Sequence, residues 1–363
     1  MRFVLDARVA AEVPAGRGRY MRELLNGLAR RDDDHDYLLV GRAPWRDRPA
    51  DPRFTWRTVP GPDPWWALRA ARSGAAGDAL LSSASYLLAA ASPVPTVATV
   101  FDLVAFDPET RPPRGALAER ATLPLALRRR RTTFACISDA TRQELLNRFP
   151  SAAGRAEVTL LGVDQDLRSR AAARPDCAER LGLPDGYVLS VGTREPRKNL
   201  VRTIAAFRGL GDEVRAGRRL VLVGHRGWAD DELDAAIRDA GELVHVAGYV
   251  DDADLPAVYA GADAFVYASF HEGFGLPVLE AMAVGTPVIT SDVSSLPEVA
   301  GDAALTVDPR SVTAIGAALA RVLAEPDLAS DLRRRGAERA AALTWDATAA
   351  ATLAMLERAA TAR

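Results

Sequence analysis

The sequence predicts an α/β protein with two Rossmann-like domains, each built on a parallel β-sheet that is covered by helices. Short β-branched runs alternate with helical patterns along almost the whole chain, which is typical of βαβ units. Runs such as residues 187–189 and 220–223 are apolar on both faces, as strands between two layers of helices must be. With 363 residues the chain is long for one hydrophobic core and suits two domains of ordinary size.

The expected strands fall into two groups. In the first half they are residues 3–8, 37–41, 54–59, 96–100 and 133–137, and in the second half 187–192, 220–224, 243–247, 264–268 and 287–290. Amphipathic stretches between the strands predict helices at 18–30, 140–149, 200–216 and 255–260.

The alternation is interrupted by a polar, Arg- and Pro-rich stretch near residues 164–186, and we place the linker between the domains there. We expect an N-terminal domain over residues 1–168 and a C-terminal domain over residues 169–345. The last helix, at about 346–363, follows the second group of strands and has room to pack back on the N-terminal domain.

The composition excludes several classes of protein. Hydrophobic residues make up 48% and charged residues 26% of the chain, as in soluble globular proteins, and the net charge of -2 argues against nucleic acid as the main partner. We find no signal peptide and no apolar run near the roughly 20 residues of a membrane span. Cys136 and Cys177 form neither a disulfide framework nor a metal cluster, so we expect a reducing, cytoplasmic location.

Lys198 is the single lysine among the 46 Lys and Arg residues. A GC-rich genome accounts for the arginine excess, but lysine offers a compact point charge where arginine offers a planar fork. Lys198 lies in segment 191–200, which follows an expected strand and opens a helix. Because such turns bind phosphates, we expect Lys198 and Arg197 to neutralise a diphosphate. The alternative is a solvated helix start.

The strongest motif, residues 271–283, follows the expected strand at 264–268. Its glycines permit a tight turn, and a proline fits the start of the helix that follows. The N–H groups around Gly275, Leu276 and Val278 then form an anion site at a helix N-terminus. We expect Glu272 before this helix and Glu280 one turn inside it to face one pocket at different depths. The alternative is a capping turn with two solvated glutamates.

A third glycine-rich turn, residues 14–20, follows the first expected strand and opens a helix. Gly16 and Gly18 allow a close approach to a phosphate or a sugar. Many βα turns carry two glycines, so this motif alone does not distinguish a binding site from an ordinary turn.

Together these segments resemble the retaining family-4 glycosyltransferases, and in particular their mannosyltransferase-like branch. Glu272 and Glu280, with seven residues between them, look like the acidic signature of that family, and residues 192–199 resemble its phosphate loop. Residues 16–20 and 161–164 resemble its N-terminal loop and its hinge-proximal turn. The resemblance runs from about residue 1 to 360. It implies the GT-B architecture, with two Rossmann domains facing a central cleft, and it implies stereochemical retention without a metal ion.

The resemblance also implies roles by position. Lys198 and Arg197 would hold the donor diphosphate, Glu272 would contact the transferred sugar, Glu280 would bind the ribose, and Gly16 would line the cleft opposite. The other donor-binding positions that we expect are Gly18, Arg194, Gly224, Tyr249, Val250, Gly273, Phe274, Gly275 and Leu276.

Two positions depart from the family pattern. Many members have a His-Asp pair after a central strand, and this chain has Phe101 and Asp102 there. Asp102 is our candidate for the acceptor hydroxyl, so that the expected catalytic residues are Glu272, Lys198 and Asp102. Many members also have Arg directly after the glycine of the phosphate loop, where this chain has Thr193, and Arg194 is the expected substitute. Both changes bear on sugar specificity.

The expected reaction is the transfer of a hexose of mannose or glucose type from a GDP- or UDP-sugar to a glycan, lipid-linked or natural-product acceptor, with no cofactor. One alternative is a nucleotide-sugar epimerase or hydrolase, for which His271 is the one histidine in the predicted cleft. Another is a non-catalytic binding protein, which Phe101 favours. A dehydrogenase is disfavoured because no Gly-x-Gly-x-x-Gly with an acidic residue on the next strand occurs.

Four arginines at positions 128–131 end an apolar helix that contains Leu123, Leu125 and Leu127. The simpler interpretation is a solvated last turn that complements the helix dipole. The alternative is a basic patch that contacts anionic lipid head groups, which would place the protein at the inner face of the membrane and suit a lipid-linked acceptor.

Overall fold

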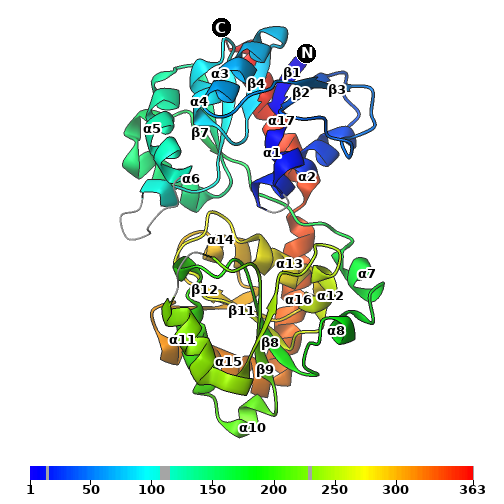
Figure 1. Cartoon of the computed structure of the whole chain (residues 1–363), viewed down its shortest axis with the longest axis vertical. Helices are drawn as coiled ribbons and strands as arrows, with labels where there is room; N and C mark the ends of the chain where they lie inside the picture. Colours follow the sequence, from blue (N-terminus) through cyan, green and yellow to red (C-terminus); the bar gives the residue numbers. More distant parts are fainter. Residues whose placement is uncertain (14–15, 107–114, 228–230, 363) are drawn as a thin grey trace. The chain divides into compact units, whose positions relative to one another are not determined.

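The structure, a computed structural model, describes residues 1–13, 16–106, 115–227 and 231–362 (Figure 1). The chain forms two compact units, Met1–Gly162 with Trp345–Arg363, and Val163–Thr344. Each unit is built on a parallel sheet with helices on its faces, so the predicted fold class is confirmed. The first unit ends at Gly162, six residues before the boundary expected from the sequence.

The first unit contains a seven-stranded parallel sheet in the order β3-β2-β1-β4-β5-β6-β7. Its strands are β1 Arg2–Asp6, β2 Asp36–Gly41, β3 Phe54–Thr58, β4 Ala79–Ser82, β5 Thr96–Val100, β6 Thr132–Cys136 and β7 Ala156–Val158. The strand order reverses between β1 and β4, which makes the sheet doubly wound. The sequence did not predict β4 and β7, because β4 is a short run without β-branched residues and β7 has three residues.

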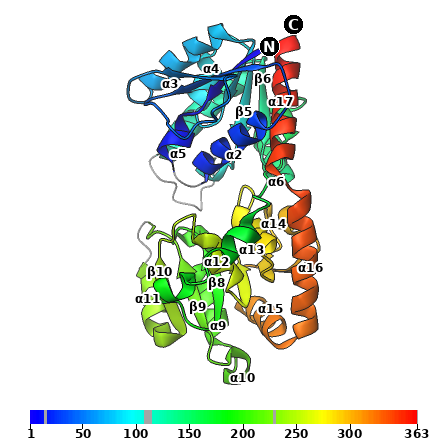
Figure 2. The ribbon, with the colours of Figure 1, turned by 90° about the vertical axis from the view of Figure 1, so that its right-hand side faces the viewer.

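The helices of the first unit are α1 Arg8–Glu12, α2 Arg17–Ala29, α3 Trp65–Ala71, α4 Tyr86–Ala91, α5 Gly115–Arg128, α6 Asp139–Arg148 and α17 Trp345–Thr361, with short 3-10 turns at Arg72–Ala76, Val104–Phe106 and Pro150–Ala152. The C-terminal helix α17 packs along α2 and against β4, β5 and β6 (Figure 2). A Cβ at Gly27 of α2 would lie 2.8 Å from the Cβ of Ala349, so the two helices meet where a glycine lets them approach.

The second unit contains a six-stranded parallel sheet in the order β10-β9-β8-β11-β12-β13. Its strands are β8 Tyr187–Val191, β9 Arg219–Val223, β10 Val244–Gly248, β11 Ala264–Tyr267, β12 Val288–Ser291 and β13 Ala304–Val307. The sequence did not predict β13. The carboxyl ends of all these parallel strands lie at one edge of the sheet, and the loops that follow β8, β9, β10 and β11 therefore gather there.

The helices of the second unit are α7 Leu167–Ala172, α8 Cys177–Arg180, α9 Leu200–Arg208, α10 Asp212–Arg215, α11 Asp231–Ala240, α12 Leu255–Ala260, α13 Leu276–Val284, α14 Leu296–Ala300, α15 Val312–Ala324 and α16 Pro326–Ala342, with 3-10 turns η4 Pro196–Lys198 and η5 Gly241–Leu243. Their apolar faces pack on the sheet, as Ile204 and Phe207 of α9 do against Leu222 of β9. The predicted single helix at 200–216 is instead two helices, because Gly209 and Gly211 separate α9 from α10.

The predicted linker near 164–186 is wrong, since this segment forms α7 and α8 and packs on α12 of the second unit. Two of its arginines converge on one buried carboxylate. Arg174 Nη1 lies 3.0 Å and Arg180 Nη2 2.8 Å from Asp254 Oδ1, next to the start of α12. The polar composition that indicated a linker therefore belongs to ion pairs that hold the segment in place.

Candidate functional site

The loop after β8 begins where three strand ends meet closely. Gly192 has φ 148° and Gly224, after β9, has φ 139°. A Cβ at Gly224 would lie 2.1 Å from the Gly192 carbonyl oxygen, and the Gly224 N–H donates to the Gly248 carbonyl at 2.7 Å. Gly224, an expected donor-binding residue, is therefore required by the packing of the strand ends.

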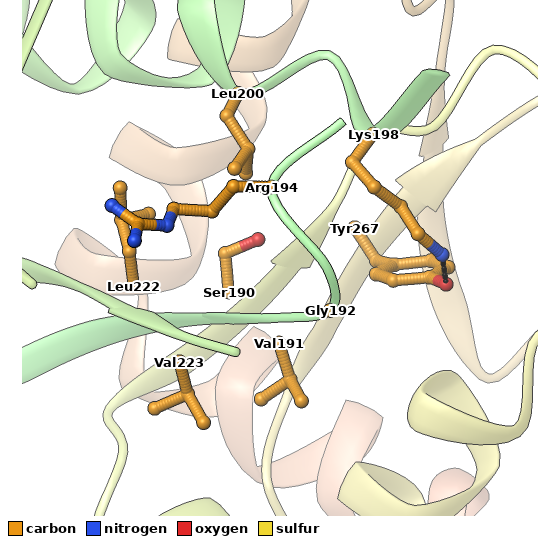
Figure 3. A pocket seen from close by; sticks show the side chains of 9 residues that line it. All are labelled: Ser190, Val191, Gly192, Arg194, Lys198, Leu200, Leu222, Val223 and Tyr267. Carbon is orange, nitrogen blue, oxygen red and sulfur yellow. Dashed lines mark hydrogen bonds between the residues drawn. The ribbon is translucent and has the colours of Figure 1, made fainter. Parts of the chain in front are cut away.

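Lys198 is placed by the turn that ends this loop. Asn199 adopts a left-handed conformation with φ 56°, and its side-chain Nδ2 donates to the carbonyls of Ala268 at 2.9 Å and Pro309 at 2.6 Å. The hydrogen bond to Ala268 joins the loop after β8 to the end of β11. The Lys198 ammonium consequently lies 4.7 Å from the centre of the Tyr267 ring and donates to the Tyr267 hydroxyl, in the narrow pocket of Figure 3.

Glu272 joins this group from the loop after β11. Its carboxylate lies 2.7 Å from Lys198 Nζ and 2.6 Å from Arg197 Nη1, and it is 8% exposed. Arg197 also donates to the His271 carbonyl at 2.7 Å and pairs with Glu195. The structure thus brings together Lys198, Arg197 and Glu272, which the sequence singled out in two separate motifs.

Burial and ion pairing together shift the pKa values of Glu272, Lys198 and Tyr267. Burial by itself would raise the pKa of Glu272, but Lys198 and Arg197 outweigh it and lower that pKa to about 2. Burial lowers the pKa of Lys198, and the neighbouring Glu272 opposes that shift. Burial and Glu272 together raise the pKa of Tyr267 well above its ordinary value. Glu272 is therefore ionised at neutral pH, and Tyr267 carries its proton.

Helix α13 begins at the turn that the sequence predicted. Gly275 precedes it with φ 114°, and Gly285 follows it with φ 91°, a left-handed conformation at both ends. Phe274 is buried, and a Cβ at Gly275 would lie 2.7 Å from Leu296 Cδ2, so the turn is packed closely. The expectation of a free N–H at Val278 is wrong, because that N–H donates to the Gly275 carbonyl at 3.0 Å.

Glu280 lies inside α13 and is 5% exposed. The buried Tyr259 of α12 donates its hydroxyl to Glu280 Oε2 at 2.9 Å. Sequence reasoning missed Tyr259, since a tyrosine in a short apolar helix carries no signal of a hydrogen bond. The contact of Glu280 with a ribose stays a prediction.

Arg194 and Lys198 line the same pocket, but no contact joins their side chains. The two side chains extend in opposite directions from the loop, and Arg194 passes the side chains of Leu200 and Leu222 (Figure 3). Its backbone explains this direction, because the Arg194 N–H donates to the His225 carbonyl at 3.0 Å and the residue forms a β-bridge with Arg226. The expectation that Arg194 substitutes for an arginine at position 193 stays a prediction.

A pair of stacked rings lies at the same edge of the sheet. The ring of Tyr249, after β10, stacks on that of His225, after β9, with centroids 4.3 Å apart and an interplanar angle of 12°. Tyr249 is 45% exposed, whereas Val250 is buried. The sequence pointed to Tyr249 and Val250 but missed His225, which no spacing rule marks.

The predicted residues Gly16, Gly18 and Asp102 lie in the first unit. Gly16 precedes α2 with φ 56°, and a Cβ at Gly18 would lie 1.8 Å from the Val13 carbonyl oxygen, so Gly18 is required by local packing. Asp102 Oδ1 accepts from the Val104 N–H at 3.1 Å and caps the turn after β5. The Arg17 guanidinium lies 5.2 Å from the centre of the Phe101 ring and pairs with Glu119 at 2.7 Å.

In the described parts of the chain, no three His, Cys, Asp or Glu side chains are grouped so that they could hold a metal ion.

The two doubly wound units define a protein of the GT-B class. The solved structure of sucrose-phosphate synthase from Thermosynechococcus elongatus covers 99% of this chain and 98% of its own with a TM-score of 0.77, and at 22% identity this likeness concerns the fold. Residues 178–339 match the family described as "Glycosyl transferases group 1". This match covers the segment that carries Lys198, Glu272 and Glu280.

Curated relatives are named as mannosyltransferases. O-antigen chain mannosyltransferase B from Escherichia coli is 42% identical over 214 residues, which are 58% of this chain and 56% of that protein. The MMP alpha-(1->4)-mannosyltransferase from Mycolicibacterium hassiacum (strain DSM 44199 / CIP 105218 / JCM 12690 / 3849) is 29% identical over 228 residues, 61% of this chain and 53% of that protein. The chain thus spans about half the length of these relatives.

We expect Glu272 to make the folded protein sensitive to acid. Its pKa is lowered from 4.5 to about 2, so its ionised form contributes stability that is present above pH 5 and is lost as the pH falls toward 2. The variant Glu272→Gln should lower the free energy of unfolding at pH 7 by about 3 kcal/mol, because it removes the carboxylate that Lys198 and Arg197 share and leaves Arg197 with Glu195 alone. Urea titrations should show this difference shrinking below pH 5.

The matched control is Glu213→Gln, on the exposed surface of α10. It should leave the free energy of unfolding close to that of the wild type at each pH. A difference between wild type and Glu272→Gln that stays constant from pH 7 to about pH 3 would contradict the ion pair.

Proposed function

We propose that this protein is a retaining glycosyltransferase that moves a hexose from a nucleotide diphosphate sugar to an acceptor hydroxyl without a metal ion. The observation that carries the proposal is the buried group of Lys198, Arg197 and Glu272 at the carboxyl edge of the second sheet. It combines two cations that can hold a diphosphate with one ionised carboxylate that can stabilise a positive sugar carbon. The match of residues 178–339 to group 1 glycosyl transferases supports the same reaction class.

The chemistry needs positive charge at the leaving group. When the bond between the sugar and the phosphate breaks, the departing diphosphate gains negative charge and the anomeric carbon becomes positive. Lys198 and Arg197 would stabilise the diphosphate together with the N–H groups of Gly275 and Leu276 at the start of α13. Each preorganised donor of this kind contributes roughly 3–4 kcal/mol in the transition state.

The incoming diphosphate must compete with Glu272 for the two cations. In the structure the Glu272 carboxylate accepts from both Lys198 and Arg197. A diphosphate that shares these donors would release the carboxylate to the sugar, where its negative charge stabilises the anomeric carbon. Because the Glu272 pKa is lowered to about 2, the carboxylate keeps this charge at neutral pH.

Retention follows if the acceptor attacks on the face from which the diphosphate leaves. The acceptor oxygen then bonds to the anomeric carbon as the bond to the phosphate oxygen breaks, and the acceptor proton moves to that phosphate oxygen. Glu272 would orient the sugar and would not carry the proton. Asp102 of the first unit stays our candidate for contact with the acceptor hydroxyl.

Mannose is the proposed sugar, since the relatives described above are named as mannosyltransferases. We propose GDP as the carrier, from the likeness of residues 192–199 to the phosphate loop of mannosyltransferases, with UDP as the alternative. The acceptor that we propose is a glycan or a lipid-linked glycan, because one relative is named for the O-antigen chain.

Removal of the lysine should test the role of the cations. We expect Lys198→Ala to lower the turnover of sugar transfer from GDP-mannose by about 100-fold, because the leaving diphosphate loses a preorganised positive charge. The matched control is Arg334→Ala, which removes an exposed cation from α16 and should leave turnover unchanged. Near wild-type turnover in Lys198→Ala would refute the proposed site.

Treatment with a strong chelator should separate this chemistry from metal-dependent transfer. Metal-dependent enzymes hold the diphosphate with a divalent ion on paired aspartates, whereas here Lys198 and Arg197 supply the positive charge. We expect the rate of transfer to be the same with and without the chelator. A loss of activity that magnesium or manganese restores would contradict the metal-free proposal.

We also propose that α5 and the arginines after it contact a membrane surface. Leu117 and Leu125 of α5 are 64% and 40% exposed, although Leu123 and Leu127 of the same helix are buried. Arg128, Arg130 and Arg131 are exposed at the end of the helix. Apolar side chains beside clustered arginines fit the interface of a bilayer that contains anionic lipids. No helix in the described part of the chain has the length and the apolar composition that crossing a bilayer requires.

Co-sedimentation with vesicles tests this contact. The protein should bind vesicles with anionic lipids at low salt and should not bind neutral vesicles. The double variant Arg130→Ala with Arg131→Ala should weaken binding roughly 30-fold, at about 1 kcal/mol for each arginine. The control pair Arg333→Ala with Arg334→Ala removes two exposed arginines from α16 and should bind like the wild type. Equal binding by both double variants would contradict the contact.

A further inference from the structure

The backbone of Glu272 is held by the loop that follows β12. Ser294 Oγ accepts from the Glu272 N–H at 3.1 Å and donates to the Glu272 carbonyl oxygen at 2.6 Å. The hydroxyl of the neighbouring Ser295 lies 2.8 Å from the same carbonyl and 2.7 Å from that of Phe274. One serine side chain thus bonds to both polar backbone atoms of Glu272.

The rest of the Glu272 loop is anchored in the same way. The Ala268 carbonyl accepts from Asn199, the Ser269 carbonyl from Ser291 Oγ at 2.6 Å, and the His271 carbonyl from Arg197. These bonds join the loop after β11 to the loop after β8 on one side and to the end of β12 on the other. Within this segment, Glu272 is the residue whose N–H and carbonyl both bond to Ser294.

The backbone of Ser294 is strained. Its φ is 60°, and the other non-glycine residues with positive φ in the described part of the chain are Asn199 and Ala216. Glycine adopts this conformation without strain, whereas a residue with a Cβ does not. Glycine would relieve the strain but could not form the two hydrogen bonds of Ser294 Oγ to Glu272. A serine at this position therefore indicates that these hydrogen bonds are needed.

We infer that Ser294 is a positioning residue for the transfer reaction. It fixes the backbone of Glu272 on both sides of the Cα atom, and through it the place where the carboxylate meets Lys198 and Arg197. This inference rests on the proposed function, because Glu272 is the group that Ser294 positions. Ser294 acts through Glu272 and needs no contact with the substrate.

Two substitutions at Ser294 separate the hydroxyl from the backbone. Ser294→Gly removes both the hydroxyl and the strain, and Ser294→Ala removes the hydroxyl and keeps the strain. We expect both variants to lower kcat by at least about tenfold. The Kd for GDP should change little, because Lys198 and Arg197 remain. The Tm should be higher for Ser294→Gly than for Ser294→Ala, so that activity and stability change independently.

Two controls remove the same features elsewhere in the second unit. Ala216→Gly relieves a positive φ at an exposed position, and Ser311→Ala removes a hydroxyl that accepts from the Ala314 N–H at the start of α15. Both should keep the wild-type kcat. If Ser294→Gly also keeps the wild-type kcat, Ser294 is only structural and the inference is wrong.

A crystal structure of Ser294→Gly decides the question without an activity assay. We expect the Glu272 carboxylate to move out of hydrogen-bond distance of Lys198 or Arg197. A carboxylate that stays in place would overturn the inference. If the wild type transfers no sugar from any nucleotide sugar, the proposed function fails, and the position of Glu272 in the variant still tests the role of Ser294.

Discussion

The site depends on one buried carboxylate that two cations share. Glu272 is almost fully buried, and a buried charge is costly unless it is paired and hydrogen-bonded. Lys198 and Arg197 provide the pair, and their own burial is compensated in turn by Glu272 and, for Arg197, by Glu195. The charge of Glu272 is therefore compensated only while both loops stay in place, and the loops that carry these residues must be held rigidly.

The parallel sheet holds the loops after β8 and β11 in place. The strands β8 and β11 are hydrogen-bonded neighbours, and their carboxyl ends bring Lys198 beside Glu272 although 74 positions separate them in the chain. Asn199 then joins the two loops through the carbonyl of Ala268, and glycines at 192 and 224 let the strand ends approach. The ion pairs thus form in a site whose geometry the backbone already determines, as preorganised catalysis requires.

Much of this arrangement could be predicted from the sequence, because it depends on local signals. Alternating runs revealed the parallel sheets, and the motifs around Lys198 and Glu272 revealed the residues that meet. The features that the sequence did not predict correctly depend on tertiary contacts. The polar segment that contains Arg174 and Arg180 has the composition of a linker, and only the tertiary structure brings Asp254 to these arginines. The strands β4, β7 and β13 are too short or too poor in β-branched residues to be recognised. The orientation of Arg194 and the bond from Ser294 to Glu272 require knowledge of which loops face each other.

The single lysine has a practical consequence. Lys198 is the one lysine ammonium in the whole chain, and its side chain is only 11% exposed. Selective isotope labelling of lysine would thus place one side-chain ammonium resonance in the spectrum of a 38.8 kDa protein. That resonance comes from the centre of the candidate site, so a shift of it on addition of a nucleoside diphosphate would report binding beside Lys198.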